Sequence, residues 1–147
     1  MIAIACDHGG FDLKPAVIEV LNELGLEYLD LGTNSSESVD YPIYGEKAAR
    51  AVASGQCDRG IILCGTGVGI AMAAGKVRGI RCANCTETFS ARMSRQHNDA
   101  NMLSLGARVV GSELAKDIVR IWLTTDFEGG ERHTRRVAMI NELDARR

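Results

Sequence analysis

Short apolar runs alternate with helical patterns along the whole chain, and this alternation limits the possible folds more than any other feature. The apolar runs predict strands at about residues 2–6, 27–31, 60–64, 80–84 and 102–106. The helical spacing predicts helices at about residues 12–24, 43–54, 86–96, 112–123 and 132–146, and a further helix that starts near Gly69. We therefore predict an α/β fold: a single domain, residues 1–147, with a three-layer α/β/α, Rossmann-like (flavodoxin-like) architecture and a five-stranded parallel sheet.

The ends of the predicted strands indicate where a ligand would bind. In open parallel sheets, ligands bind outside the carboxyl ends of the strands. Asp7 and His8 follow the first predicted strand, residues 64–69 follow the third, and Arg108 follows the fifth. These residues also have the most obvious chemical uses, so we predict a functional site at this edge.

Composition argues against several classes of protein. The 147 residues carry a formal net charge of −2, which argues against a nucleic-acid partner. The longest uncharged run, residues 60–75, has 16 residues and five glycines, so it is too short and too flexible to cross a membrane. The five cysteines are an odd number and no secretory signal is evident, so we expect reduced thiols and a cytoplasmic protein.

The segment GIILCGTGVGIAMAAGK, residues 60–76, has glycine at the alternate positions 65, 67 and 69. Glycine permits positive φ and lets the backbone approach a ligand closely. The N–H groups of such a loop converge beside a helix N-terminus, where negative charge is favoured. The segment therefore predicts an anion-binding loop. A tight turn that uses glycine only for packing is the alternative interpretation.

Neither of two common nucleotide motifs is complete in this segment. A Walker A motif requires glycine where Ile70 stands and a hydroxyl residue where Val77 stands. The dinucleotide fingerprint requires its third glycine at position 70 as well. The sequence therefore gives little support to ATP or NAD, so we expect no cofactor.

Cys64 lies where the third predicted strand meets the glycine loop. A helix N-terminus and converging N–H groups lower a thiol pKa from about 8.5, so we expect a thiolate that acts as a base or nucleophile. A small buried hydrophobic residue is the alternative. Cys82 and Cys85 form a C-x-x-C pair, but positions three apart on an extended segment face opposite sides of a sheet. We therefore expect neither a redox pair nor a zinc site there.

Six segments occur in an order that resembles ribose-5-phosphate isomerases of the B type. They are CDHGGF at 6–11, DYP at 40–42, CGTGVGI at 64–70, SRQHND at 94–99, RVVG at 108–111 and ERHTRRV at 131–137. The resemblance runs from Asp7 to about Val137, which is nearly the whole chain. Galactose-6-phosphate and allose-6-phosphate isomerases share the scaffold, so six-carbon sugar phosphates are alternative substrates.

The resemblance implies a metal-free aldose–ketose isomerisation of a phosphorylated sugar through a cis-enediolate. Cys64 would be the proton-transferring base, and His97 the acid that also takes part in opening the furanose ring. We also expect Thr66 to be catalytic, because Thr66 and the loop amides can contact the oxyanion and the sugar. The expected substrate-binding residues are Asp7, His8, Gly65, Thr66, Gly67, Val68, Gly69, Asn98, Arg108, Arg132 and Arg136.

Elementary chemistry agrees with these roles. A proton can move between adjacent carbons if one base has a pKa near neutrality and the developing oxyanion is stabilised. Arg132 and Arg136 are four residues apart, so on a helix they share a face and can bind a phosphate together with Arg108. The alternative is a solvated helix face. Glu131 is an extra residue relative to the usual family segment, which leaves the arginine register open, and the role of His133 is undecided.

Family members are homodimers or dimers of dimers whose active sites use both chains, so the resemblance implies the same assembly here. We expect the last helix, residues 132–146, to contribute to the dimer. Trp122, Val137, Ile140 and Leu143 are candidates for the interface, with burial inside one chain as the alternative.

Two other function classes are weighed against the isomerase. One is a non-catalytic module that binds a phosphosugar or nucleotide, in which Cys64 would serve only for packing. The other is a metal-dependent isomerase that uses Asp7, His8 and His97.

Overall fold

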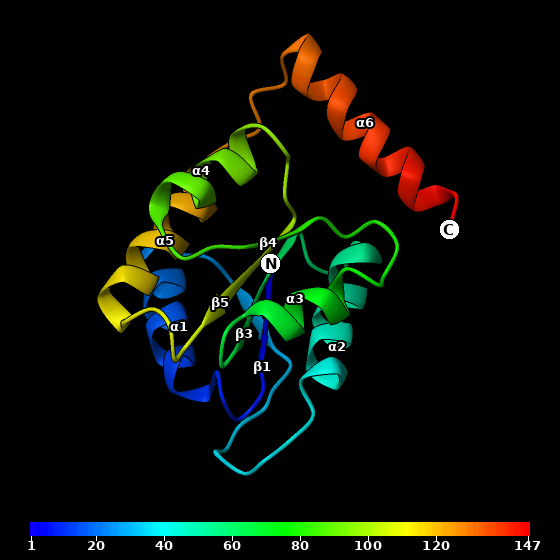
Figure 1. Ribbon diagram of the computed structural model, residues 1–147. Helices are drawn as coiled ribbons and strands as arrows, with labels where there is room; N and C mark the ends of the chain where they lie inside the picture. Colours follow the sequence, from blue (N-terminus) through cyan, green and yellow to red (C-terminus); the bar gives the residue numbers. More distant parts are fainter.

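The five apolar runs form one parallel sheet, and the computed structural model describes all 147 residues around it (Figure 1). The strands are β1 (Ile2–Cys6), β2 (Tyr28–Asp30), β3 (Arg59–Cys64), β4 (Cys82–Asn84) and β5 (Met102–Gly106). Their order in the sheet is β2-β1-β3-β5-β4. The predicted strands are confirmed, although the edge strands β2 and β4 have only three residues each. Compared with the flavodoxin order 2-1-3-4-5, the last two strands are exchanged.

Helices cover both faces of the sheet, which confirms the predicted three layers. They are α1 (Lys14–Glu23), preceded by the short 3-10 helix η1 (Phe11–Leu13), and α2 (Tyr41–Ala53), α3 (Val68–Ala74), α4 (Thr88–Gln96), α5 (Ser112–Thr124) and α6 (Glu131–Ala145). The chain crosses from β1 to β2 and from β4 to β5 in one direction, and from β2 to β3 and β3 to β4 in the other. Right-handed crossovers therefore place α1 and α4 on one face and α2 and α3 on the other.

The core has two layers because side chains alternate along each strand. In β3, Ile61 and Leu63 pack toward α1 and α5, whereas Ile62 and Cys64 pack toward α2 and α3. Trp122 lies in the first layer and is fully buried. The prediction that Trp122 lies at an interface is therefore wrong, because α5 directs this side chain into the core.

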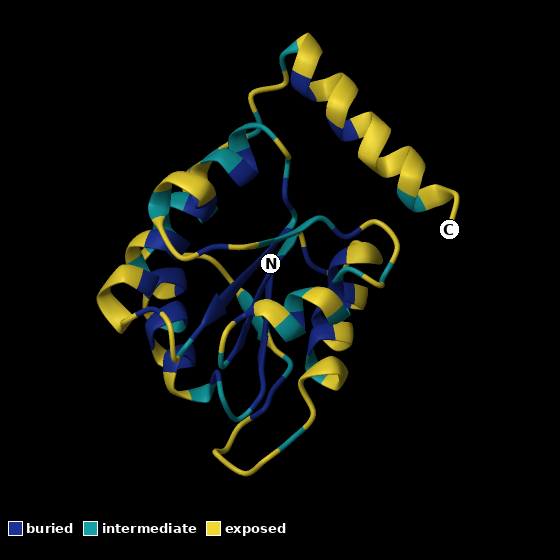
Figure 2. Ribbon diagram, in the orientation of Figure 1, coloured by how far each residue is buried: buried dark blue, intermediate teal, exposed yellow.

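The ribbon of α6 is set apart from the sheet and the other helices, and side chains join it to them (Figure 1). Most of its surface is exposed, and only His133 and Val137 are buried (Figure 2). Its far end is joined to residues 75–81 by polar contacts, among them a 2.6 Å hydrogen bond from the Gly79 N–H to Asp144 Oδ2. No helix in the chain has both the length and the apolar character that a membrane span requires.

Candidate active site

The carboxyl ends of the central strands β1, β3 and β5 lie side by side, and the loops that follow them carry many of the expected site residues (Figure 1). The chain leaves β1 toward β2 on one side and leaves β3 toward β4 on the other side. Parallel sheets bind ligands where successive connections diverge in this way. Asp7 and His8 follow β1 and Cys64 ends β3, so these residues flank this position.

Cys64 is held by the backbone of the glycine loop. The residue is only 5% exposed, and its Sγ accepts a hydrogen bond from the Gly67 N–H over 3.0 Å. Gly67 immediately precedes α3 and has a left-handed conformation, with φ of +81°. A Cβ there would lie 2.6 Å from Asn84 Oδ1 and 2.8 Å from the Leu105 carbonyl carbon, so glycine is required. The loop thus directs a backbone N–H group at the sulfur.

Two other glycines let this loop pack against neighbouring segments. A Cβ at Gly65 would lie 3.1 Å from Arg108 Nη1, and a Cβ at Gly69 would lie 2.7 Å from the Tyr41 ring. The Gly65 carbonyl also accepts a hydrogen bond from the Arg108 N–H over 3.0 Å. Arg108 therefore joins the group at the carboxyl end, as predicted, and Tyr41 is added to it.

Thr66 and Val68 lie at the exposed part of the same loop. The Thr66 Oγ1 accepts a hydrogen bond from the Val68 N–H over 3.2 Å. Since this contact uses the hydroxyl only as an acceptor, its proton is free to donate to a bound molecule. The Thr66 backbone packs closely on Gly106, where an added Cβ would lie 2.5 Å from the Thr66 carbonyl.

Asp7 and His8 form the opposite wall. Asp7 is buried, and its Oδ1 accepts a hydrogen bond from the Gly10 N–H over 3.0 Å. The Nδ1 atom of His8 accepts from the Val39 N–H over 3.1 Å. In the neutral ring the proton is therefore on Nε2, which is left as a donor for a ligand.

The remaining predicted residues lie at the other end of the sheet. His97 caps the C-terminus of α4, which runs back from the carboxyl end of β4 to the amino end of β5. Nearby, the Asn101 carbonyl accepts from the Gly60 N–H at the start of β3. The length of β3 separates this region from Cys64, about 16 Å at 3.3 Å per residue. His97, Asn98, Arg132 and Arg136 are therefore not brought to Cys64 within one chain.

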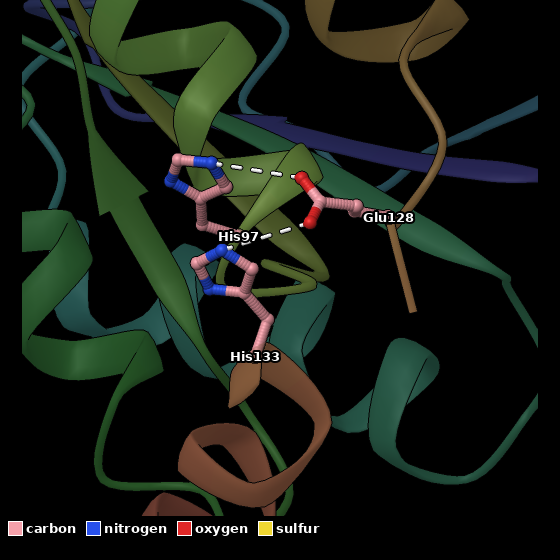
Figure 3. A group of neighbouring side chains, drawn as sticks. All are labelled: His97, Glu128 and His133. Atoms are coloured by element: carbon pink, nitrogen blue, oxygen red, sulfur yellow. Dashed lines mark ion pairs between the residues drawn. The ribbon is translucent and has the colours of Figure 1, made fainter. Parts of the chain in front are cut away.

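At this amino end, His97 stacks on His133 and both face Glu128 (Figure 3). The ring centroids are 4.1 Å apart and the ring planes differ by 6°. Glu128 Oε2 lies 3.9 Å from His97 Nε2, and Glu128 Oε1 lies 3.8 Å from His133 Nε2. Burial lowers the pKa of His133, and the adjacent His97, Arg132 and Arg136 lower it further, against the opposing effect of Glu128.

Arg132 and Arg136 are both exposed on α6, and neither is paired with a carboxylate within the chain. The helix begins at Glu131, so both arginines lie in its first two turns and keep their four-residue spacing. The extra residue Glu131 thus leaves them on one face of α6. They are available for an anion such as a phosphate.

The structure also tests the alternative sites. Asp7 and His8 lie at the opposite end from His97, so one chain does not bring these three together as a metal site. Cys82 packs against one core layer and Cys85 lies in the other, as expected for positions that face opposite sides of the sheet. Burial raises the pKa of Cys82 to about 12 and that of Cys85 to about 11, so both are neutral thiols.

Sequence reasoning missed Tyr41, Val39 and Glu128. Tyr41 belongs to the DYP segment, so a signal for it existed. Val39 contributes only its backbone N–H, and Glu128 precedes α6 in a loop without a periodic pattern. No residue pattern could have identified those two.

Comparison with known proteins decides the family. The model of the Ribose/Galactose Isomerase family matches residues 2–140. The chain belongs to this family. The suspected resemblance is therefore confirmed, and with it the class of enzyme, an aldose–ketose isomerase.

Individual members of the family match nearly the whole chain. The ribose-5-phosphate isomerase B of Escherichia coli is 54% identical over 146 residues, which cover 99% of this chain and 97% of the relative. The D-erythrulose-4-phosphate isomerase of Pectobacterium atrosepticum is 44% identical over 130 residues, covering 88% and 86%. The structure of ribose-5-phosphate isomerase B from Clostridium thermocellum is 56% identical with a TM-score of 0.95, and the match covers 99% and 97% of the two chains.

Proposed function

We propose that this protein interconverts ribose 5-phosphate and ribulose 5-phosphate, with Cys64 as the base and His97 as the acid that opens the ring. The observation that carries the proposal is the hydrogen bond from the Gly67 N–H to Cys64 Sγ, in a family of sugar-phosphate isomerases. The neighbouring cysteine Cys6 is unsuited to this role, because burial raises its pKa to about 11.

The proton transfer follows from the loop's geometry. A Cys64 thiolate takes the proton from C2 of the open-chain aldose, and the electron pair moves onto the C1 oxygen to give the cis-enediolate. The Thr66 hydroxyl proton and the other loop N–H groups stabilise that oxyanion, since the Gly67 and Val68 N–H groups already donate to Cys64 Sγ and Thr66 Oγ1. The proton of the C2 hydroxyl then passes to the C1 oxygen as the thiol returns its proton to C1, which yields the ketose. No cofactor is needed, because no electrons leave the substrate.

Ring opening and phosphate binding fall to the residues of the amino end. His97 donates a proton to the ring oxygen as its bond to C1 breaks, and the anomeric hydroxyl gives up its proton to solvent to form the aldehyde. Asn98 beside His97 binds the sugar. Arg132 and Arg136 bind the phosphate with bidentate hydrogen bonds. At the carboxyl end, Asp7, His8 and Arg108 contact the sugar phosphate.

The two ends can form one site only if two chains assemble. We propose a symmetric homodimer, alone or within a dimer of dimers, in which His97, Arg132 and Arg136 of one copy meet Cys64 of the other. Exposed apolar side chains lie on α6 and around the glycine loop, and the partner would cover them: Tyr41, Ile43, Val68, Met72, Met139, Ile140 and Leu143. A helix as little covered as α6 is marginally stable without such packing.

We also propose that the protein works in a reducing compartment, the cytoplasm. All five cysteines are free, and Cys64 must stay reduced to act as a base. The net charge of −2 gives no support to a nucleic-acid partner.

An isomerase assay tests this function directly. We expect turnover of ribose 5-phosphate to exceed that of allose 6-phosphate, galactose 6-phosphate and D-erythrulose 4-phosphate, the last included because a relative is named for it. Cys64→Ala should lower kcat about 10³-fold, the usual range for losing a catalytic base. Binding of ribose 5-phosphate without turnover by the wild type would favour the non-catalytic module. Faster turnover of one of the other three sugar phosphates would identify that compound as the substrate in place of ribose 5-phosphate.

A further inference from the structure

Isomerisation does not explain why His97, Glu128 and His133 converge from the end of α4, the loop between α5 and α6, and the first turn of α6 (Figure 3). One potential ligand atom from each lies within 4.8 Å of the others. We propose that these three side chains bind a divalent transition-metal ion of the zinc type, and that the bound ion inhibits the isomerase by occupying His97. The inhibition rests on the proposed function, whereas the binding does not.

The side chains must rearrange to share one ion. The two imidazole rings are stacked, with centroids 4.1 Å and planes 6° apart, and a metal binds in the plane of a ring, so one imidazole has to rotate out of the stack. Zinc–nitrogen and zinc–oxygen bonds of about 2.0–2.2 Å in a tetrahedral site place neighbouring ligand atoms about 3.4 Å apart. The His97 and His133 Nε2 atoms lie 3.9 and 3.8 Å from the two different oxygens of Glu128, and the three ligand atoms lie within 4.8 Å of one another, so they must also move closer together. The side chains of His97 and Glu128 are 35% and 43% exposed, so they have room to move, whereas His133 is 7% exposed and acts as a fixed anchor.

The carboxylate is already held in place. The Glu128 N–H donates to the Gln96 carbonyl over 3.0 Å, and Gln96 Nε2 donates to Glu128 Oε2 over 3.2 Å. These two bonds fasten the loop to the end of α4, immediately before His97. An ion therefore does not have to order the loop that carries Glu128.

The ligand types and the surrounding charges select the ion. Two imidazoles and one carboxylate suit Zn²⁺, Cu²⁺ or Ni²⁺, whereas Mg²⁺ and Ca²⁺ require mostly oxygen ligands. Arg132 and Arg136 lie close to His133 and repel cations, and Glu128 is the one carboxylate within the group. Binding must then depend on coordinate bonds to the imidazoles rather than on charge. Mg²⁺ has the same charge as Zn²⁺ but prefers oxygen ligands, so it is the comparison ion.

Calorimetric titration of the full-length protein with Zn²⁺ tests the binding, using wild type, Glu128→Gln and His133→Gln. We expect one ion per chain, and at least a tenfold weaker affinity in each variant. Asp126→Asn, an exposed carboxylate change in the same loop, should leave the affinity unchanged. Because cysteines also bind zinc, absorption spectra with Co²⁺ provide a second measurement, and we expect no thiolate charge-transfer band.

Inhibition is measured separately, as the ratio of turnover with and without Zn²⁺ for each protein. The concentration that halves wild-type turnover should match the calorimetric Kd and rise by the same factor in Glu128→Gln. Equal zinc affinity in the wild type and both variants, or a thiolate band with Co²⁺, would overturn the metal site. Binding at these residues without loss of turnover would overturn the inhibition. A metal-free wild type inactive on every sugar phosphate would instead refute the proposed function, and the calorimetry would still decide the binding.

Discussion

The two ends of the sheet differ in how they are built, although both contribute residues to one proposed site. At the carboxyl end the backbone sets the geometry: Cys64 is buried, and an N–H group of a glycine in a left-handed conformation faces its sulfur. At the amino end the geometry is set by side chains from α4, α6 and the loop between α5 and α6. His97 and both arginines are partly or fully exposed there. The difference suggests that the proton-transferring half is complete within each chain, whereas the ring-opening half is completed by contact with a partner.

The strongest test of this comparison mixes two inactive chains. Neither Cys64→Ala nor His97→Asn should show appreciable activity alone with ribose 5-phosphate. If each site joins Cys64 of one chain to His97 of the other, unfolding and refolding an equal mixture should restore about a quarter of wild-type activity, because half of the dimers are mixed and each has one intact site. Activity assays of the refolded mixture measure this. Absence of recovery, with mixed dimers verified by mass spectrometry, would mean that both residues act within one chain.

A substrate without a ring should isolate the contribution of the amino end. Erythrose 4-phosphate cannot close to a furanose, because its 4-hydroxyl is esterified. His97→Asn should therefore lower turnover of ribose 5-phosphate by about 10²-fold or more, the usual range for a general acid, and affect erythrose 4-phosphate less than tenfold. Steady-state kinetics with both sugars provide the comparison. Cys64→Ala is the matched control, since it should impair both substrates equally; equal losses in His97→Asn would remove the ring-opening role.

The rigid backbone of the carboxyl end predicts a loss of stability on adding one methyl group. Gly67→Ala should lower the free energy of unfolding by about 2 kcal/mol or more, from its positive φ together with the close contacts to Asn84 and Leu105. Gly25→Ala is the matched control: its φ is +67°, but nothing lies within 4 Å of an added Cβ. We expect that control to lose about 1 kcal/mol, the cost of positive φ alone. Urea denaturation measures both, and equal losses would contradict the close packing of this loop.

The smallest expected effect concerns pH and the amino end. Because the folded chain lowers the pKa of His133 from about 6.5, the unfolded chain binds this proton more readily. The free energy of unfolding should therefore fall as the pH drops below about 6.5. The fall should end once the pH is below the lowered pKa of His133 in the folded chain. His133→Gln should reduce that slope, and urea midpoints between about pH 7.5 and 5 would reveal it. An unchanged slope in the variant would show that His133 is not the group responsible.

The sequence was informative where structure is local. The central strands β1, β3 and β5 are buried and appear as continuous apolar runs, so they were predictable, and so was the gathering of Asp7, Cys64 and Arg108 at one edge. The order of the strands was not predictable. Nothing in the sequence of residues 102–106 specifies that this strand lies between β3 and β4 and not at the edge of the sheet, next to β4. Trp122 was misjudged because helical spacing shows that a side chain faces something apolar, without showing whether that is the core or a partner. The position of His97 required the direction of α4, which only the fold supplies.

The position of α6, held away from the body and carrying His133 and both arginines, has a consequence for the cell. If this helix completes a neighbour's catalytic centre, a newly made polypeptide is inert until it meets a second one. Output would then rise with the square of protein abundance when copies are scarce, and become proportional to abundance once pairing saturates.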